Sequence, residues 1–424
     1  MPPLSNLIFK KFIVNKLLNR SNTNFAVIDG IRAIAVLWVI FFHAWLFQQL
    51  TIPGFIDKIY DYPLFYWVTK GDLGVDLFFV ISGFLIGTII FKEIRTSEKF
   101  NFKRFYVRRF LRLSPVYIFA IFLNLYFLKE YGQDDLLKYW PNILYINNYV
   151  SNAPMGWTWS LAIEEQFYII VPFLLVYIFP KFKNKATFFI LLSAISISLT
   201  WYYVYVLKQY RLPFNLTFFT EDWKAWFDSY YMVTHLRYIG LLLGVATAYV
   251  NVYKTIEVKN IFETNANLIT ILSFTSLLGI FVISFTPVGE WMPMKTSIFY
   301  DLNIHVGRWY EILTRPLFSL FVAFIIITCI HGSNIVINPV KKFLSLKFFY
   351  PIAQVSYSAY LFHEMFIIWV GPRLVKYLTP NYSNTQIFFI TILISIVVIF
   401  IVAVIMYYII EQPFQKIREK IKFQ

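Results

Sequence analysis

Two ionisable residues share one face of the first strongly apolar segment, at 26–50. Arg32 lies near its start and His43 follows eleven residues later, almost three helical turns and about 16 Å along the axis. Ionisable groups inside an apolar segment of membrane length are costly, so they indicate function. The guanidinium suits an anionic group, and the imidazole suits proton transfer. A snorkelling arginine and a hydrogen-bonded structural histidine are the alternative interpretation.

Acidic residues occur at a matching depth in two further apolar segments. Asp76 lies near the start of segment 73–91, and Glu164 lies about two turns into segment 157–180. If the first segment runs outward and the second returns, Asp76 falls at the depth of His43. A carboxylate beside an imidazole fixes its tautomer and raises its basicity. We therefore predict a His43–Asp76 general-base pair, with a helix cap as the alternative for Asp76.

Polar side chains continue the faces that carry these groups. Ser160 and Tyr168 lie one turn before and one turn after Glu164, so this helix face is polar. We predict that Glu164 orients an acceptor or polarises the site. A second polar face, with i, i+4 and i+7 spacing, is predicted to support substrate binding in segment 349–370: Ser356, Tyr360 and His363.

The most basic part of the chain follows the second apolar segment. It ends in Arg108, Arg109 and Arg112, whose spacing groups them on one helical face at the start of the third apolar segment. Clustered guanidinium groups suit phosphate recognition because their donors match its oxygens. Anchoring to anionic lipid is the alternative for the same cluster.

Composition places these groups in a membrane protein. Of 424 residues, 58% are hydrophobic and only 14% are charged, against about 25% in an average soluble domain. This excludes an ordinary soluble enzyme. The net charge of +15 predicts no nucleic-acid partner here, because basic residues collect in the cytoplasmic loops of membrane proteins. One cysteine, Cys329, excludes an internal disulfide, and five scattered histidines predict no metal site.

Ten apolar runs have lengths that suit membrane-spanning helices. With a cytoplasmic N-terminus, 24 Lys and Arg fall in the predicted cytoplasmic segments and 11 in the outer loops. The positive-inside rule therefore predicts an all-α polytopic protein of the cytoplasmic (inner) membrane, with both termini cytoplasmic. The runs lie at 26–50, 73–91, 113–128, 157–180, 187–207, 232–250, 267–287, 312–330, 349–370 and 386–410.

Three parts are predicted along the chain. Residues 1–25 form a basic amphipathic segment on the cytoplasmic face of the membrane. Residues 26–410 form the ten-helix transmembrane domain, and residues 411–424 form a short basic cytoplasmic tail. The outer loops are rich in aromatic residues, which stack well on sugar rings. An interfacial aromatic belt is the alternative for these residues.

Six short motifs resemble those of the acyltransferase 3 family of integral membrane acyltransferases. The stretch from Asp29 to His43 is similar to the family's Arg-x10-His signature, and the run from Gly74 to Gly83 is similar to its second-span motif. No proline follows His363 before Pro372, which departs from many members. The other motifs are Arg109–Arg112 (Arg-x-x-Arg), Trp159–Glu164 (Trp-Ser-Leu-x-x-Glu), Ser356–His363 (Ser-Tyr…Tyr-Leu-x-His) and Glu411–Pro413 (Glu-x-Pro).

The resemblance implies a ten-helix core that takes an acyl group, usually acetyl, from cytoplasmic acyl-CoA. The group is placed on a hydroxyl of a carbohydrate at or beyond the outer face. In the family the acceptor is O-antigen, peptidoglycan, exopolysaccharide or a small glycoside. Arg32, Arg108, Arg109 and Arg112 would then hold the phosphates of coenzyme A, near the cytoplasmic mouth of the domain.

The sequence is compatible with two mechanisms of acyl transfer and with two competing functions. His43, paired with Asp76, would deprotonate the acceptor hydroxyl, or His43 would itself be acylated first as a covalent relay. In the competing class, a proton-coupled transporter or flippase, the intramembrane His, Asp and Glu form a proton path. A non-catalytic membrane partner is a third class, and it would tolerate substitution of Arg109 and Arg112.

Overall fold

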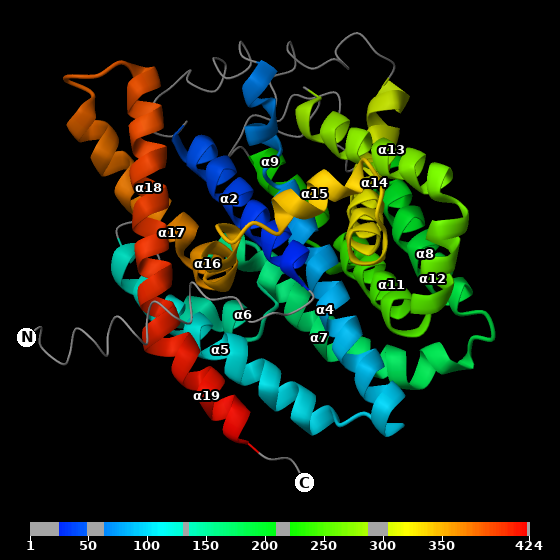
Figure 1. Cartoon of the computed structure of the whole chain (residues 1–424). Coiled ribbons are helices and arrows are strands. Elements are labelled where there is room, and N and C mark those ends of the chain that lie inside the picture. Colours follow the sequence, from blue (N-terminus) through cyan, green and yellow to red (C-terminus); the bar gives the residue numbers. More distant parts are fainter. Residues whose placement is uncertain (1–24, 49–62, 130–134, 209–220, 287–303, 422–424) are drawn as a thin grey trace, which may run out of the picture.

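The computed structural model describes residues 25–48, 63–129, 135–208, 221–286 and 304–421, and its regular elements in these ranges are all helices (Figure 1). The longer helices are α2 (Ala26–Gln48), α4 (Leu73–Ser97), α5 (Phe102–Phe127), α7 (Trp159–Phe173), α8 (Lys185–Tyr205), α11 (Ile239–Tyr253), α13 (Ala266–Phe285), α14 (Ile304–His331), α17 (Ser356–Leu378) and α18 (Asn384–Met406). The shorter helices are η1 (Pro63–Lys70), η3 (Leu136–Tyr139), α6 (Trp140–Ile143), η4 (Gly156–Thr158), η5 (Leu174–Ile178), η6 (Phe179–Lys181), α9 (Glu221–Trp226), η7 (Phe227–Tyr231), α10 (Thr234–Arg237), α12 (Thr255–Thr264), α15 (Ile337–Leu344), α16 (Phe349–Gln354), η9 (Tyr407–Glu411) and α19 (Gln412–Lys420).

The all-α, polytopic architecture is confirmed. Among the described residues, eight helical stretches are long and apolar enough to cross a membrane, and the bent pair α11 and α12 would make nine. Each of the ten predicted runs coincides with a helix. Helix α17, in the ninth run, is outside that group because Ser356, Ser358, His363 and Glu364 lower the hydropathy of its first half. The orientation of the termini stays a prediction.

The third helix is longer than predicted. It begins at Phe102 and not at 113, because the side chain of Asn101 accepts a hydrogen bond from the backbone N–H of Arg104 and caps its first turn. The arginine-rich stretch is therefore part of α5 itself. Helix α5 therefore carries Arg109 and Arg112 on its inward side, whereas Arg108 is exposed.

Close packing of α4 against α11 fixes the centre of the bundle. The facing surfaces carry Gly83 and Gly87 on one helix and Gly240 and Gly244 on the other. A Cβ on Gly83 would lie 2.0 Å from the Leu241 carbonyl oxygen, closer than any contact a packed carbon makes. Such small-residue pairs let two membrane helices approach closely.

Helix α2 crosses the middle of the molecule and contacts both α4 and α17 (Figure 1). Helix α17 also packs against α18 and α5, while α7 contacts α4. The five helices that carry the predicted site residues, α2, α4, α5, α7 and α17, thus surround one interior. Beyond α18, η9 leads into α19, which packs against α5. The predicted segment 1–25 lies almost wholly outside the described residues.

Candidate active site

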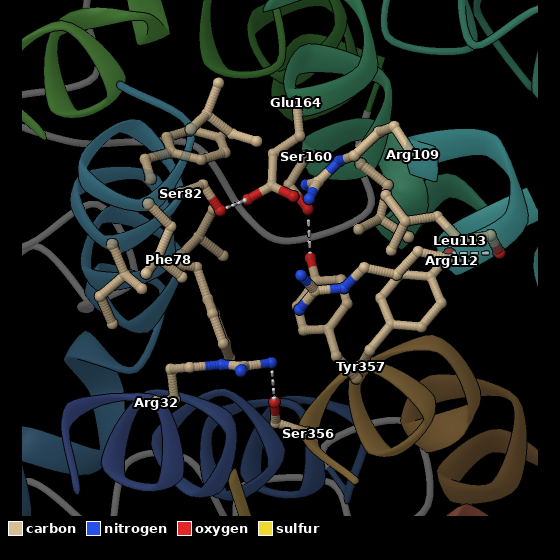
Figure 2. A pocket seen from close by; sticks show the side chains of 17 residues that line it. Arg32, Phe78, Ser82, Arg109, Arg112, Leu113, Ser160, Glu164, Ser356 and Tyr357 are labelled. Carbon is tan, nitrogen blue, oxygen red and sulfur yellow. Dashed lines mark hydrogen bonds between the residues drawn. The ribbon is translucent and has the colours of Figure 1, made fainter. Parts of the chain in front are cut away.

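An inner chamber lies between these five helices. Figure 2 shows side chains from opposite walls pointing into it: Arg32 from α2, Arg109 and Arg112 from α5, and Glu164 from α7. The predicted residues Ser160, Ser356 and Tyr360 also line this chamber. The structure therefore brings together most of the residues that the sequence singled out.

Glu164 is held by two hydroxyl groups at one wall of the inner chamber. The Ser82 hydroxyl donates to Glu164 Oε1 at 2.7 Å, and the Tyr168 hydroxyl donates to Oε2 at 2.9 Å. Arg109 stacks its guanidinium on the Tyr168 ring, 3.7 Å from the centroid. The Glu164 carboxyl group and the Arg109 cation are thus fixed by one tyrosine.

The arginines of α5 divide between two cavities. Arg109 and Arg112 line the inner chamber and also a groove beside it, whereas Arg108 lines only the groove, together with Arg104 and Arg418. Arg108, Arg109 and Arg112 form no salt bridge with a carboxylate among the described residues. Cations without a carboxylate partner at the junction of two cavities are suited to an anionic ligand that enters from the groove.

Arg32 reaches the inner chamber from the opposite wall. Its Nη2 donates to the Ser356 hydroxyl at 3.0 Å, so the start of α2 is tied to the start of α17. The same two helices meet again further along, at His43 and His363. The predicted common face of Arg32 and His43 therefore packs along α17.

Tyr360 separates the inner chamber from a second, outer chamber. Both cavities are lined by Tyr360 and Val75. The Tyr360 hydroxyl lies 2.5 Å from the Ser160 hydroxyl and donates to the Trp157 carbonyl oxygen at 3.2 Å. Groove, inner chamber and outer chamber thus follow one another, and each shares lining residues with the next.

The outer chamber combines aromatic walls with three ionisable groups. The ionisable residues are His43, Asp72 and Glu364. The aromatic residues are Phe42, Phe47, Trp157, Trp159, Phe227, Tyr231 and Tyr360.

Hydrogen bonds set the tautomers of two adjacent histidines in this chamber. Nδ1 of His363 is bonded to the Tyr360 carbonyl oxygen, and Nδ1 of His43 lies 3.1 Å from the Val39 carbonyl oxygen. Carbonyl oxygens only accept, so each neutral ring carries its proton on Nδ1. His363 Nε2 then accepts from His43 Nδ1–H at 2.9 Å. His43 Nε2 is left with its lone pair in the outer chamber, as a base requires.

The predicted His43–Asp76 pair is not formed. Asp76, which is 1% exposed, binds Arg315 Nη1 at 2.5 Å and Arg237 Nη2 at 3.5 Å. Arg315 also binds Asp72 at 2.8 Å. The Asp76 side chain points toward α10 and α14, where two arginines neutralise it. His363 occupies the position beside His43 that was predicted for Asp76.

Three residues at the site were missed from the sequence. Glu364 follows His363 and lies 3.7 Å from His43 Nε2, although adjacent residues point about 100° apart on a helix. Ser82 belongs to the second-span motif, but only its hydrogen bond to Glu164 in the structure indicates a role at the site. Arg315 was not among the predicted site residues, and it binds both Asp76 of α4 and Asp72, which immediately precedes α4.

The outer chamber also contains three possible metal ligands. One ligating atom each of His43, His363 and Glu364 lies within 4.8 Å of the others. Two imidazoles and a carboxylate are a ligand set that suits Zn²⁺. The absence of a metal stays a prediction, and chelation tests it.

The same segments carry a family signature. Residues 25–408 match the family model Acyl_transf_3, described as an acyltransferase domain. The chain belongs to the acyltransferase 3 family. The match runs from the start of α2 to η9, so it includes every helix that lines the two chambers. The resemblance seen in the six motifs is thereby confirmed, and the chain is a multi-pass membrane protein of this family.

The curated relatives of this chain are longer than the region that aligns with it. O-acetyltransferase OatA of Staphylococcus aureus (strain NCTC 8325 / PS 47) is 29% identical over 412 residues, which are 92% of this chain and 57% of the relative. A putative O-acetyltransferase of S. aureus (strain COL) is 30% identical over 413 residues, with the same coverage. Nose resistant to fluoxetine protein 6 of Caenorhabditis elegans is 24% identical over 383 residues, 80% of this chain and 44% of the relative. The chain thus spans about half the length of these relatives. No solved structure matches it significantly.

Proposed function

We propose that this protein is an O-acyltransferase that moves an acyl group, acetyl in the simplest case, from cytoplasmic acyl-CoA to a hydroxyl of a cell-envelope or exported carbohydrate. Two relatives are named O-acetyltransferases. The observation that carries the proposal is the row of three connected cavities, with unpaired cations at one end and an imidazole base at the other.

The donor would enter from the groove. Arg108 would meet the nucleotide phosphates there, and Arg109 and Arg112 would hold the phosphates nearest the inner chamber. The slender pantetheine arm suits the inner chamber, whose walls are mainly apolar between Arg32 and Glu164. The thioester would then reach His43 only by displacing the Tyr360 side chain.

His43 would act as the general base, oriented by His363. Its Nε2 takes the proton from the acceptor hydroxyl while the hydroxyl oxygen bonds to the thioester carbonyl carbon. The carbon–sulfur bond breaks, and the departing sulfur receives the proton from the His43 imidazolium. One ester and one thiol are formed, with no other reactant. A covalent acyl-histidine relay would use the same lone pair.

The basic end of the molecule would face the cytoplasm. Arg104, Arg108 and Arg418 gather at the groove, which agrees with the positive-inside rule. The outer chamber would then lie toward the opposite face of the cytoplasmic membrane, where an exported carbohydrate is present. Its aromatic walls suit sugar rings.

Inside-out vesicles supplied with radiolabelled acetyl-CoA test the proposal. We expect wild type to label extractable cell-envelope glycan, and His43→Ala to lose the transfer. His331→Ala is the matched control, because that imidazole bonds to Asn251 away from the three cavities. Labelling by His43→Ala at the wild-type rate would overturn the proposal. Glycan movement without release of coenzyme A would instead favour the transporter or flippase.

A further inference from the structure

The Glu364 carboxyl group has no hydrogen-bond partner among the described residues. It lines the outer chamber with 13% of its side chain exposed, and its nearest ionisable atom is His43 Nε2, 3.7 Å away. That separation is too long for a direct hydrogen bond. The Glu364 carboxyl oxygens can therefore accept a hydrogen bond from a hydroxyl group that enters the outer chamber.

Glu364 is not needed to orient the His43 base. His43 already donates through Nδ1 to Val39 and His363, which fixes its tautomer and ring position. The Glu364 oxygen lies on the other side of the ring, next to the nitrogen that carries the lone pair. Glu364 therefore shares with His43 the space in which the acceptor hydroxyl must sit.

We propose that Glu364 and His43 together bind two adjacent hydroxyl groups of the acceptor. Two acceptor atoms 3.7 Å apart can each take a hydrogen bond from one hydroxyl of a gauche vicinal diol, whose oxygens are themselves separated by about one hydrogen-bond length. Carboxyl oxygens accept in either protonation state. The hydroxyl bound to His43 is the one acylated, and the hydroxyl bound to Glu364 sets the position. This inference rests on the proposed function.

The remaining walls suit a cyclic polyol more than an open chain. Trp157, Trp159 and Tyr231 line the chamber, and the C–H faces of a sugar ring pack on aromatic side chains. Asp72 adds a second carboxyl group, whose Oδ2 binds Arg315 and whose Oδ1 has no hydrogen bond among the described residues. The substrate class is therefore a pyranoside that carries a free vicinal diol.

Methyl glucoside and methyl galactoside, each with its monodeoxy derivatives, test this inference. The purified protein in nanodiscs is assayed for acetyl transfer from acetyl-CoA and, without donor, for binding of radiolabelled glycoside. We expect wild type to prefer a diol over its monodeoxy derivative by roughly threefold to tenfold in kcat/KM, as the loss of one hydrogen bond implies. Glu364→Ala should remove this preference, and Glu364→Gln should keep part of it because an amide oxygen still accepts.

Glu98→Ala is the matched control, since Glu98 is an exposed acid just beyond α4. It should keep the wild-type preference. If Glu364→Ala slows diol and monodeoxy acceptors equally, Glu364 positions His43 and the inference is overturned. Failure of wild type to label any glycoside or glycan would contradict the proposed function. In that case the binding measurements without acetyl-CoA test the inference by themselves. Equal binding of the diol and the monodeoxy glycosides would overturn it.

Discussion

At the scale of single residues, the chemistry of the site depends on the hydrogen bonds that surround His43 and His363. The Tyr360 and Val39 carbonyl oxygens place the protons on Nδ1 of His363 and His43. The free lone pair of His43 follows from those bonds and not from a carboxylate. His363 has no exposed surface, so the imidazole pair is held rigidly within the wall of the outer chamber.

Substituting His363 tests this pairing. In His363→Leu the Nδ1–H of His43 loses a partner, so the ring turns more freely and we expect transfer to fall roughly 10–100-fold, as for other partners that orient a functional imidazole. His363→Gln can still accept that proton and should retain more activity. Initial rates at saturating donor measure both. Equal rates for wild type and His363→Leu would contradict the assigned role.

Asp76 is predicted to matter for stability. Asp76→Ala leaves the buried Arg237, which is 3% exposed, without its carboxylate and leaves Arg315 with Asp72 alone. We expect a loss of about 3–5 kcal/mol, as for one partner removed from a buried ion pair. Thermal unfolding in detergent measures it. An Asp76→Ala protein of wild-type stability but without transfer would return Asp76 to the catalytic group.

Chelation tests whether the imidazole pair works as a base or as metal ligands. The proposed mechanism needs no metal, so dialysis against EDTA should leave the transfer rate unchanged, although the three ligating atoms lie within 4.8 Å. Transfer that disappears with EDTA and returns with Zn²⁺ would replace the base mechanism with a metal-assisted one.

The sequence predicted which helices contribute to the site better than which side chains meet there. Counting residues along a helix gives the spacing of side chains on that helix, because the rise per residue is constant. It does not give the rotation or the height of one helix against another. Asp76 therefore binds Arg315 and not His43, and Glu164 lines the inner chamber and not the outer one. For the same reason, the contact of Glu364 with His43 could not be predicted.

At the scale of elements, two close approaches fix the bundle. Helices α4 and α11 meet through paired glycines, and the start of α17 is tied to α2 by the bond from Arg32 to Ser356. The apolar periodicity located these helices well. Their ends were harder to predict, because the polar stretch before 113 reads as a loop, and only the Asn101 cap reveals it as the start of α5.

Glycine substitutions test the α4–α11 contact. A Cβ on Gly244 would lie 2.2 Å from the Val80 carbonyl oxygen, so Gly244→Ala must push the helices apart. We expect lowered thermal stability and a lowered yield of folded protein. Gly371→Ala, in α17, is the control, because its Cβ would meet nothing within 4 Å, and alanine favours the helix by about 1 kcal/mol. Equal stability of the two variants would contradict close packing.

At the scale of the whole molecule, charge and cavities follow one axis. Arg108, Arg109 and Arg112, which have no carboxylate partner among the described residues, lie at the groove. Apolar and hydroxyl-bearing walls form the inner chamber, and His43 lines the outer chamber. Composition and the distribution of Lys and Arg predicted a polarised membrane protein. They did not predict that Tyr360 would separate two chambers, because that depends on how α7 and α17 meet.

The position of Tyr360 between the two chambers gives a prediction about the path from the groove to His43. Tyr360→Trp enlarges the side chain between the chambers and removes the hydroxyl that contacts Ser160. We expect transfer to fall at least tenfold while binding of coenzyme A is unchanged, since the arginines lie on the other side of Tyr360. Radiolabelled coenzyme A binding and transfer rates measure the two effects. Wild-type transfer by Tyr360→Trp would contradict a path past this residue.

The most direct test of the central claim is a cryo-electron microscopy structure with a non-hydrolysable acetyl-CoA analogue. The account predicts phosphates against Arg109 and Arg112, the pantetheine arm in the inner chamber, and the acetyl carbonyl beside His43 Nε2. An analogue bound with its phosphates away from these arginines, or with its acetyl group remote from His43, would contradict it.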